Sequence, residues 1–166
     1  MTALYQSFQW LYEQPWAGAL RESEDAYPLI ESIHVLSIAV IVGSVVTVDL
    51  RVLGLVLRQE AVTRVGRALL PVTWSGFAIM VLTGLPLFAA QAVQLYSNPA
   101  FRLKILLLAL AAINAALFHA TSYRGVDDWG HAAVAPLRAR AFATVSIALW
   151  SAVIVSGRLI AVFHDH

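Results

Sequence analysis

The stretch PLIESIHVLSIAVIVGSVVTVDLRVLGLVL, residues 28–57, decides the fold. Apart from a few polar positions it is continuously apolar, and about 20 residues of α-helix suffice to cross the hydrocarbon core of a bilayer. Pro28 stands at its start, where the first turn of a helix tolerates proline. The segment therefore predicts a first membrane-spanning helix whose end projects beyond the hydrocarbon.

Three more apolar segments follow, at residues 68–96, 101–122 and 138–163, and each is long enough to span. Before them, residues 2–13 carry apolar and aromatic side chains at helical spacing, which predicts a short helix in the membrane interface. We therefore expect an all-α fold: a four-helix transmembrane bundle with a short amino-terminal amphipathic interfacial helix. Residues 1–27 are expected to form the interfacial helix and an acidic link, and residues 28–166 the bundle.

The composition agrees with a chain whose main solvent is lipid. Of the 166 residues, 60% are apolar and 13% are charged, and the mean hydropathy is +0.74, whereas soluble domains carry about 25% charged residues. The net charge of +1 excludes a strongly basic nucleic-acid surface. Cysteine is absent, which excludes disulfides, thiolate metal ligands and a thiol nucleophile. The predicted partner is therefore the lipid bilayer, with no nucleic acid.

The distribution of basic residues predicts the orientation. Arginines gather after the first and third spans, and short loops rich in Lys and Arg face the cytoplasm; these residues are Arg51, Arg58, Arg64, Arg67, Arg124, Arg138 and Arg140. Because the number of spans is even, both termini are expected on the other, extracytoplasmic side.

Ionisable side chains inside a bilayer cost free energy, so each one is a candidate functional residue. In the first span, Glu31 and Asp49 share one helical face at about 100° per residue, and His34 lies about 60° from it. The other polar residues at membrane depth are Lys104, Asn114, His119 and Arg158. Helical rise sorts the ionisable ones into an outer layer with Glu31, His34, Lys104 and Arg158, and an inner layer with Asp49, Arg51 and His119.

Two structural or metal-binding interpretations apply to these residues. A buried ion pair of Glu31 with Arg158 or Lys104 would join the helices, while Asp49 would pair with another helix or cap a loop. The spacing of Glu31 and His34 is also that of di-iron carboxylate bundles, which makes both candidate metal ligands. The sequence has no second Glu-x-x-His motif, which such a site requires. The tail, residues 164–166, is a further candidate for weak metal binding.

The two intramembrane histidines also suit haem b. His34 and His119 are the candidate axial ligands, and Lys104 and Arg158 the candidate charge partners for the cofactor. Helical rise separates the histidines by roughly 15 Å in depth, so they cannot bind one iron within a single chain. Either a homodimer pairs each histidine with its own copy, or a single haem takes one histidine ligand.

The chain resembles a family of small four-span bacterial inner-membrane proteins, a domain of unknown function. The segments that carry the resemblance are Pro28–His34, Val48–Gly54, Leu70–Phe77, Asn98–Lys104, Asn114, Phe118–His119 and Gly157–Arg158. The resemblance implies that Glu31, His34, Asp49, Lys104, Asn114, His119 and Arg158 belong to the family's signature, and that the protein lies in the bacterial inner membrane. The architecture also resembles small membrane b-type cytochromes, although this chain has fewer intramembrane histidines.

These residues support three functional hypotheses. The first is a haem-binding or redox component that transfers electrons. Its partner would be a membrane redox protein or a second copy of the chain. The second is a transport protein for an ion or small solute, in which Glu31, His34, Asp49 and Asn114 line a polar path. The third is an accessory membrane subunit with no site of its own. No nucleophile and base arrangement indicates hydrolysis, and the sequence leaves open whether the protein is an enzyme.

Overall fold

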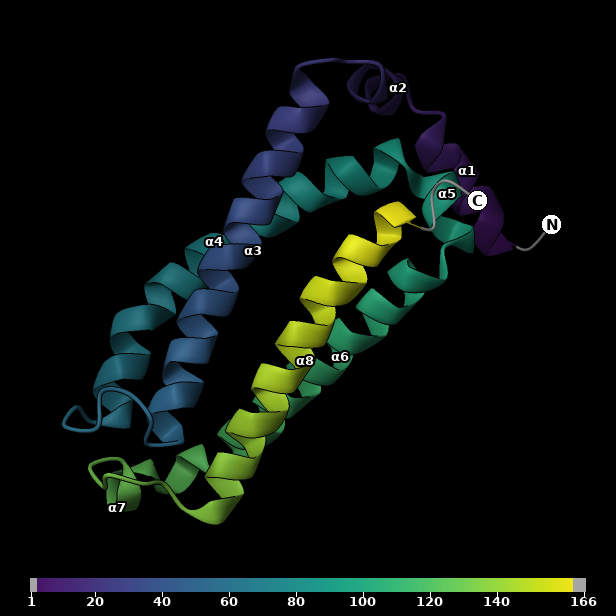
Figure 1. The fold of residues 1–166 in the computed structure, drawn as a ribbon. Helices are drawn as coiled ribbons and strands as arrows, with labels where there is room; N and C mark the ends of the chain where they lie inside the picture. The colour runs from purple at the N-terminus through teal and green to yellow at the C-terminus, as the bar shows by residue number, and fades with distance from the viewer. Residues whose placement is uncertain (1–2, 163–166) are drawn as a thin grey trace.

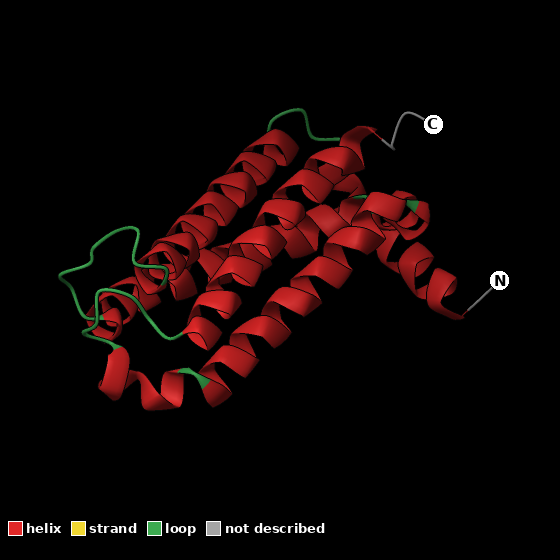
Figure 2. Cartoon of the chain, turned by 60° about the horizontal axis from the view of Figure 1, so that its bottom comes forward, coloured by secondary structure: helices red, strands yellow, loops and turns green. Residues whose placement is uncertain are grey.

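The computed structural model describes residues 3–162, and this part of the chain is helical with no strand (Figures 1 and 2). In chain order the elements are α1 (Ala3–Tyr12), α2 (Pro15–Arg21), α3 (Ala26–Val52), α4 (Val62–Ala90), α5 (Ala92–Ser97), α6 (Pro99–Thr121), the 3-10 turn η1 (Tyr123–Gly125), α7 (Val126–Trp129) and α8 (Leu137–Val162). The predicted all-α bundle with a short amino-terminal helix is confirmed. The tail at residues 164–166, a candidate for metal binding, lies outside the described residues.

Four helices, α3, α4, α6 and α8, are long and apolar enough to cross a membrane. They form two antiparallel pairs, α3 with α4 and α6 with α8, and α3 also packs on α8 (Figure 1). A hydrogen bond of 2.8 Å joins the hydroxyls of Ser44 and Thr73 across the first pair. In Figure 1, α1 and the last turn of α8 lie at one end of the bundle, and α7 lies at the other. We call these the α1 end and the α7 end.

The first span ends earlier than the sequence predicts. We expected it to reach Leu57, but α3 stops at Val52 because Gly54 adopts a left-handed conformation with φ +72°. The Gly54 amide then donates to the Arg51 carbonyl at 3.0 Å, and the Leu55 amide donates to the Leu50 carbonyl at 2.9 Å. These are the two bonds of a Schellman motif, which satisfies carbonyls at a helix end.

The second span also differs from its prediction. We expected one helix over residues 68–96, but α4 begins at Val62 and is interrupted at Gln91, so that α5 is a separate short helix. The Arg21 guanidinium donates to the Ala90 carbonyl at 3.2 Å and so satisfies the end of α4. Arg21 belongs to α2, a helix in the segment that we expected to be an acidic link. This contact fixes the amino-terminal helices on the α1 end.

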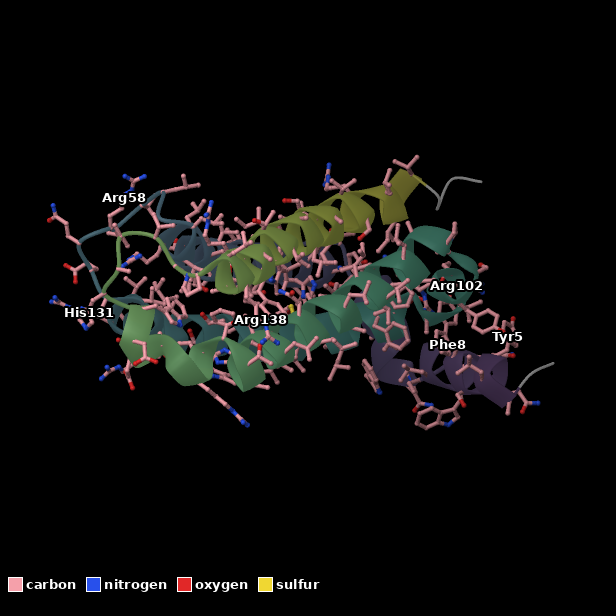
Figure 3. The ribbon with its side chains drawn as sticks, turned by 90° about the horizontal axis from the view of Figure 1, so that it is seen from below. Tyr5, Phe8, Arg58, Arg102, His131 and Arg138 are labelled. Atoms are coloured by element: carbon pink, nitrogen blue, oxygen red, sulfur yellow. The ribbon has the colours of Figure 1, made fainter. Side chains whose placement is uncertain are left out.

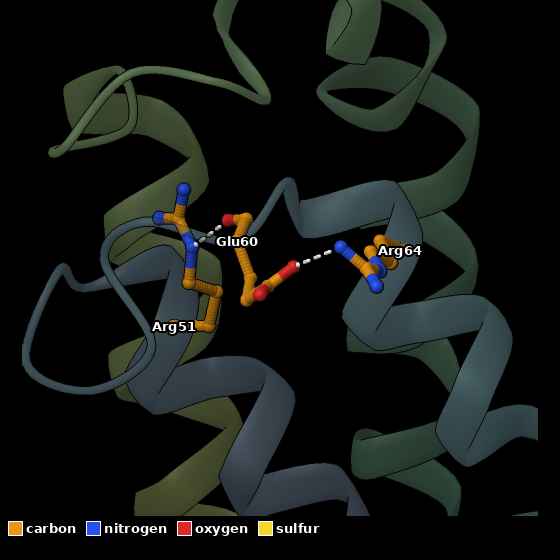
Figure 4. Close-up of polar contacts among 3 residues, drawn as sticks. All are labelled: Arg51, Glu60 and Arg64. Atoms are coloured by element: carbon orange, nitrogen blue, oxygen red, sulfur yellow. Dashed lines mark hydrogen bonds and ion pairs between the residues drawn. The ribbon is translucent and has the colours of Figure 1, made fainter.

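At the α7 end, a buried arginine holds two loops together. Arg51 is fully buried, and its Nε atom donates to the Glu60 carbonyl at 2.6 Å (Figure 4). Its Nη2 atom donates to the carbonyls of Gly130 and Ala132 at 3.3 and 3.1 Å. Beside it lies a buried apolar cluster that includes Val52, Val62, Val126, Ala135, Ala139 and Ala143. The α3–α4 loop and the α7–α8 loop are therefore tied through one side chain.

At the α1 end, Asn98 ties α6 to α8. Its Oδ1 atom accepts from the amides of Ala100 and Phe101 at 3.0 and 3.1 Å, which caps the start of α6. Its Nδ2 atom donates to the Ile160 carbonyl at 3.1 Å in the last turn of α8. Asn98 is buried, and it therefore fixes the relative position of the two helices that form one side of the cavity described below.

Candidate functional site

A cavity of about 520 Å³ lies between the four spanning helices towards the α1 end. Its wall is almost entirely apolar and includes Ile38 and Ile41 from α3 and Trp150 and Val153 from α8. Two basic side chains enter it, His34 from α3 and Lys104 from α6. No acidic side chain of the described residues lines it. Small-molecule sites typically measure about 300–1,000 Å³ and combine apolar walls with a few polar groups, and this cavity has those properties.

The imidazole of His34 is held in one orientation against α4. Its Nδ1 atom lies 3.1 Å from the Met80 carbonyl and 3.0 Å from the Thr83 hydroxyl. Because a carbonyl only accepts, Nδ1 carries the proton that is donated to Met80. Nε2 is then the unprotonated nitrogen of the neutral ring of this cavity-lining residue.

Gly84 makes this position of the imidazole possible. A Cβ atom at residue 84 would lie 2.8 Å from His34 Cε1 and 3.3 Å from Nδ1. Real Cβ atoms essentially never approach so closely, so any other residue would displace the ring. The glycine on α4 is therefore part of the site, although its own backbone is ordinary helix.

Lys104 supplies a cation without a counter-ion. Its Nζ atom lies 3.7 Å from the position that a Cβ atom would take at Gly157, so the side chain runs along α8 at a glycine. Across residues 3–162, Lys104 makes neither a hydrogen bond nor an ion pair. An ammonium in an apolar cavity costs free energy unless it is paired, which suggests that an anionic group completes the site.

Aromatic side chains close the cavity at the α1 end. Phe8 of α1 packs edge-on against Phe88 at 5.2 Å and Tyr96 at 5.4 Å between ring centroids, and Phe88 stacks on Phe101 at 5.7 Å. Phe8, Phe88 and Phe101 all line the cavity. Figure 3 shows Tyr5 and Phe8 beside Arg102 at this end, opposite Arg58 and His131. The helix α1, expected to lie in the interface, thus also covers the site.

The predicted ion pair of Glu31 with Arg158 or Lys104 is wrong. Within the described part of the chain, the one salt bridge joins Arg64 to Glu60 at 2.9 Å on the surface. Glu31 and Arg158 are exposed, and neither lines the cavity. The exposure of Glu31 depends on how the helices pack around its end of α3, which helical periodicity alone does not give.

The remaining polar candidates lie apart from the cavity. The Asn114 amide donates to the Phe142 carbonyl at 3.2 Å and so joins α6 to α8. Asp49 has the Ser146 hydroxyl of α8 as a hydrogen-bonding neighbour, while its Oδ2 atom is buried with no hydrogen-bond partner among the described residues. The residues expected to line a polar path are therefore not brought together, and the cavity wall is apolar.

His119 lies on the surface of α6, where its ring packs against Tyr123 with the centroids 5.0 Å apart. It does not line the cavity that holds His34. It can meet the His119 of another copy only across an interface between two chains. Among residues 3–162, no group of three or more His, Asp or Glu side chains could hold a metal ion.

The fold and the cavity together define a small membrane protein in which four helices long and apolar enough to span the bilayer surround a mainly apolar cavity. The chain belongs to a family of unknown function, DUF6644, whose model matches residues 25–163. This confirms the resemblance to a small membrane-protein family of unassigned activity. Neither the curated proteins nor the solved structures that were searched contain a match.

Three residues of the cavity wall were not among the candidate site residues predicted from the sequence. Gly84, as a small residue in an apolar span, indicates close helix packing but does not identify the neighbouring side chain. Phe8 belongs to a helix assigned to the interface. Trp150, near the centre of the fourth span, lines the cavity, and an intramembrane tryptophan away from the interface is the one sequence signal that was available.

Proposed function

We propose that the protein binds haem b in this cavity and serves as an electron-transfer component of the bacterial inner membrane. One observation carries the proposal: Nδ1 of His34 donates to the Met80 carbonyl and leaves Nε2 for a ligand in an apolar cavity. Metal-ligating histidines almost always donate their other ring nitrogen to a carbonyl, a carboxylate or water, which fixes the tautomer. When bound, haem supplies one-electron chemistry.

The other residues of the cavity fit the same cofactor. Lys104 is an unpaired cation that can neutralise a propionate, and the apolar wall excludes water from the macrocycle. His119 and Arg158, also proposed from the sequence, do not line this cavity. Within residues 3–162, His34 is therefore the one histidine that lines the cavity, and the proposal is a haem with this single histidine ligand.

The absorption spectrum of the purified protein tests this proposal. We expect a Soret band in the protein as isolated, or after addition of haem to the protein in detergent. His34→Ala should lose the band, because no other imidazole of residues 3–162 lines the cavity. His119→Ala is the matched control: it removes an exposed histidine of α6 and should leave the band unchanged. Absence of a Soret band from the wild-type protein after haem addition would refute haem binding.

Gly84→Ala tests the same proposal with a smaller change, which moves the His34 imidazole instead of removing it. The new methyl group must displace the His34 ring, which weakens its bond to Met80 and moves Nε2. We expect haem affinity to fall about 10–100-fold, as for other losses of a group that orients a metal ligand. Gly66→Ala on the same helix is the control, since a Cβ atom there meets nothing within 4 Å. Equal titration curves for the two variants would show that the ring position is unimportant.

A further inference from the structure

The cavity opens sideways between α4 and α6. Val81 and Leu85 of α4 and Ile105 of α6 line it, yet they are 37%, 62% and 51% exposed. These three side chains therefore form the rim of a mouth on the surface that the spanning helices present to lipid. The two helices that flank the mouth belong to different pairs, since α4 packs on α3 and α6 packs on α8.

An apolar cavity with such a mouth is in contact with acyl chains of the bilayer. Its wall offers the same apolar environment as the hydrocarbon, so an acyl chain can enter without exposing apolar surface to water. Water reaches it poorly from the α1 end, where Phe8, Phe88 and Phe101 cover it. The ligands with direct access are thus molecules dissolved in the membrane.

Lys104 determines which of these molecules is favoured. It lies five residues into α6, about 8 Å along the helix from its start, beneath the aromatic cover. The head group that meets it must therefore be small and anionic. A carboxylate satisfies both conditions, whereas a phospholipid head group would have to leave the aqueous layer and displace the aromatic rings.

We infer that the cavity binds a long-chain fatty acid taken from the bilayer, with its carboxylate on Lys104 and its chain along the apolar wall towards the mouth. This binding does not require haem and goes beyond the proposed function. The two ligands share the cavity and should compete. They differ in the residue on which each depends, His34 for haem and Lys104 for the fatty acid.

Quenching of Trp150 fluorescence by a doxyl-labelled stearic acid in proteoliposomes tests the inference. Trp150 lines the cavity, and the part of the quenching that disappears in Trp150→Phe reports its occupancy. We expect this part to saturate with added probe and to be reversed by unlabelled stearic acid. Lys104→Met should raise the probe concentration for half-saturation by roughly tenfold, because it removes a charge-assisted contact in a dry site.

Two controls separate this result from general lipid contact and from haem binding. Arg158→Met removes a cation of α8 that is exposed and outside the cavity, and it should leave half-saturation unchanged. His34→Ala should abolish haem binding while preserving quenching. The inference is overturned if Trp150 quenching rises linearly with probe, if the methyl ester of the probe binds as tightly as the acid, or if Lys104→Met behaves as wild type.

Discussion

Replacing Arg51 with alanine should destabilise the protein by about 3–5 kcal/mol, because hydrogen bonds to a charged group contribute about 1.5–3 kcal/mol each and the variant loses three of them. The guanidinium is fully buried and donates to the carbonyls of Glu60, Gly130 and Ala132. The variant leaves these carbonyls without their donor and opens a void between two loops. The free energy of unfolding, measured by titration with a denaturing detergent in mixed micelles, gives the loss directly.

Arg64→Ala is the matched control for this measurement. Arg64 is also an arginine at the α7 end, but its side chain is 77% exposed and its one ion pair, with Glu60, lies on the surface (Figure 4). Such pairs contribute about 0–1 kcal/mol. Similar losses for Arg51→Ala and Arg64→Ala would show that the buried contacts of Arg51 do not stabilise the loops.

The second large effect is expected for Gly54→Ala, at about 2–3 kcal/mol of lost stability. The position has φ +72°, a left-handed conformation that costs residues with a Cβ atom about 1–2 kcal/mol. The new Cβ atom would also lie 2.6 Å from the Ala133 carbonyl oxygen, so the α7–α8 loop would have to move. The same detergent titration measures the change.

Gly43→Ala on α3 is the control for this substitution. A Cβ atom at Gly43 meets nothing within 4 Å, and alanine has the higher helix propensity. This variant should be as stable as the wild type or slightly more stable. If Gly54→Ala were as stable as Gly43→Ala, neither the left-handed conformation of Gly54 nor the close contact with Ala133 would restrict the residue at position 54.

Two of the candidate residues share a cavity, although the sequence considered each of them on its own helix. The cost of a buried ionisable group singled out His34 and Lys104, and both line the cavity. Glu31 was a candidate for the same reason, yet it is exposed. The helix face that contacts neighbouring helices depends on packing, which the sequence of one helix does not show. In a soluble helix the apolar stripe marks that face. In a spanning helix lipid and protein interior are equally apolar, so the stripe is missing.

The sequence by itself determined the helical class and the four segments that are long and apolar enough to span a membrane. Both follow from the length of the apolar segments, because the thickness of the bilayer sets how many helical residues are needed to cross it. Only the tertiary structure decided that α3 and α6 place His34 and Lys104 in one cavity, that Gly84 makes room for the imidazole and that α1 covers it. These features depend on the rotation and pairing of helices far apart in the chain. Helix contacts in the membrane depend on shape and small residues rather than on a hydrophobic pattern.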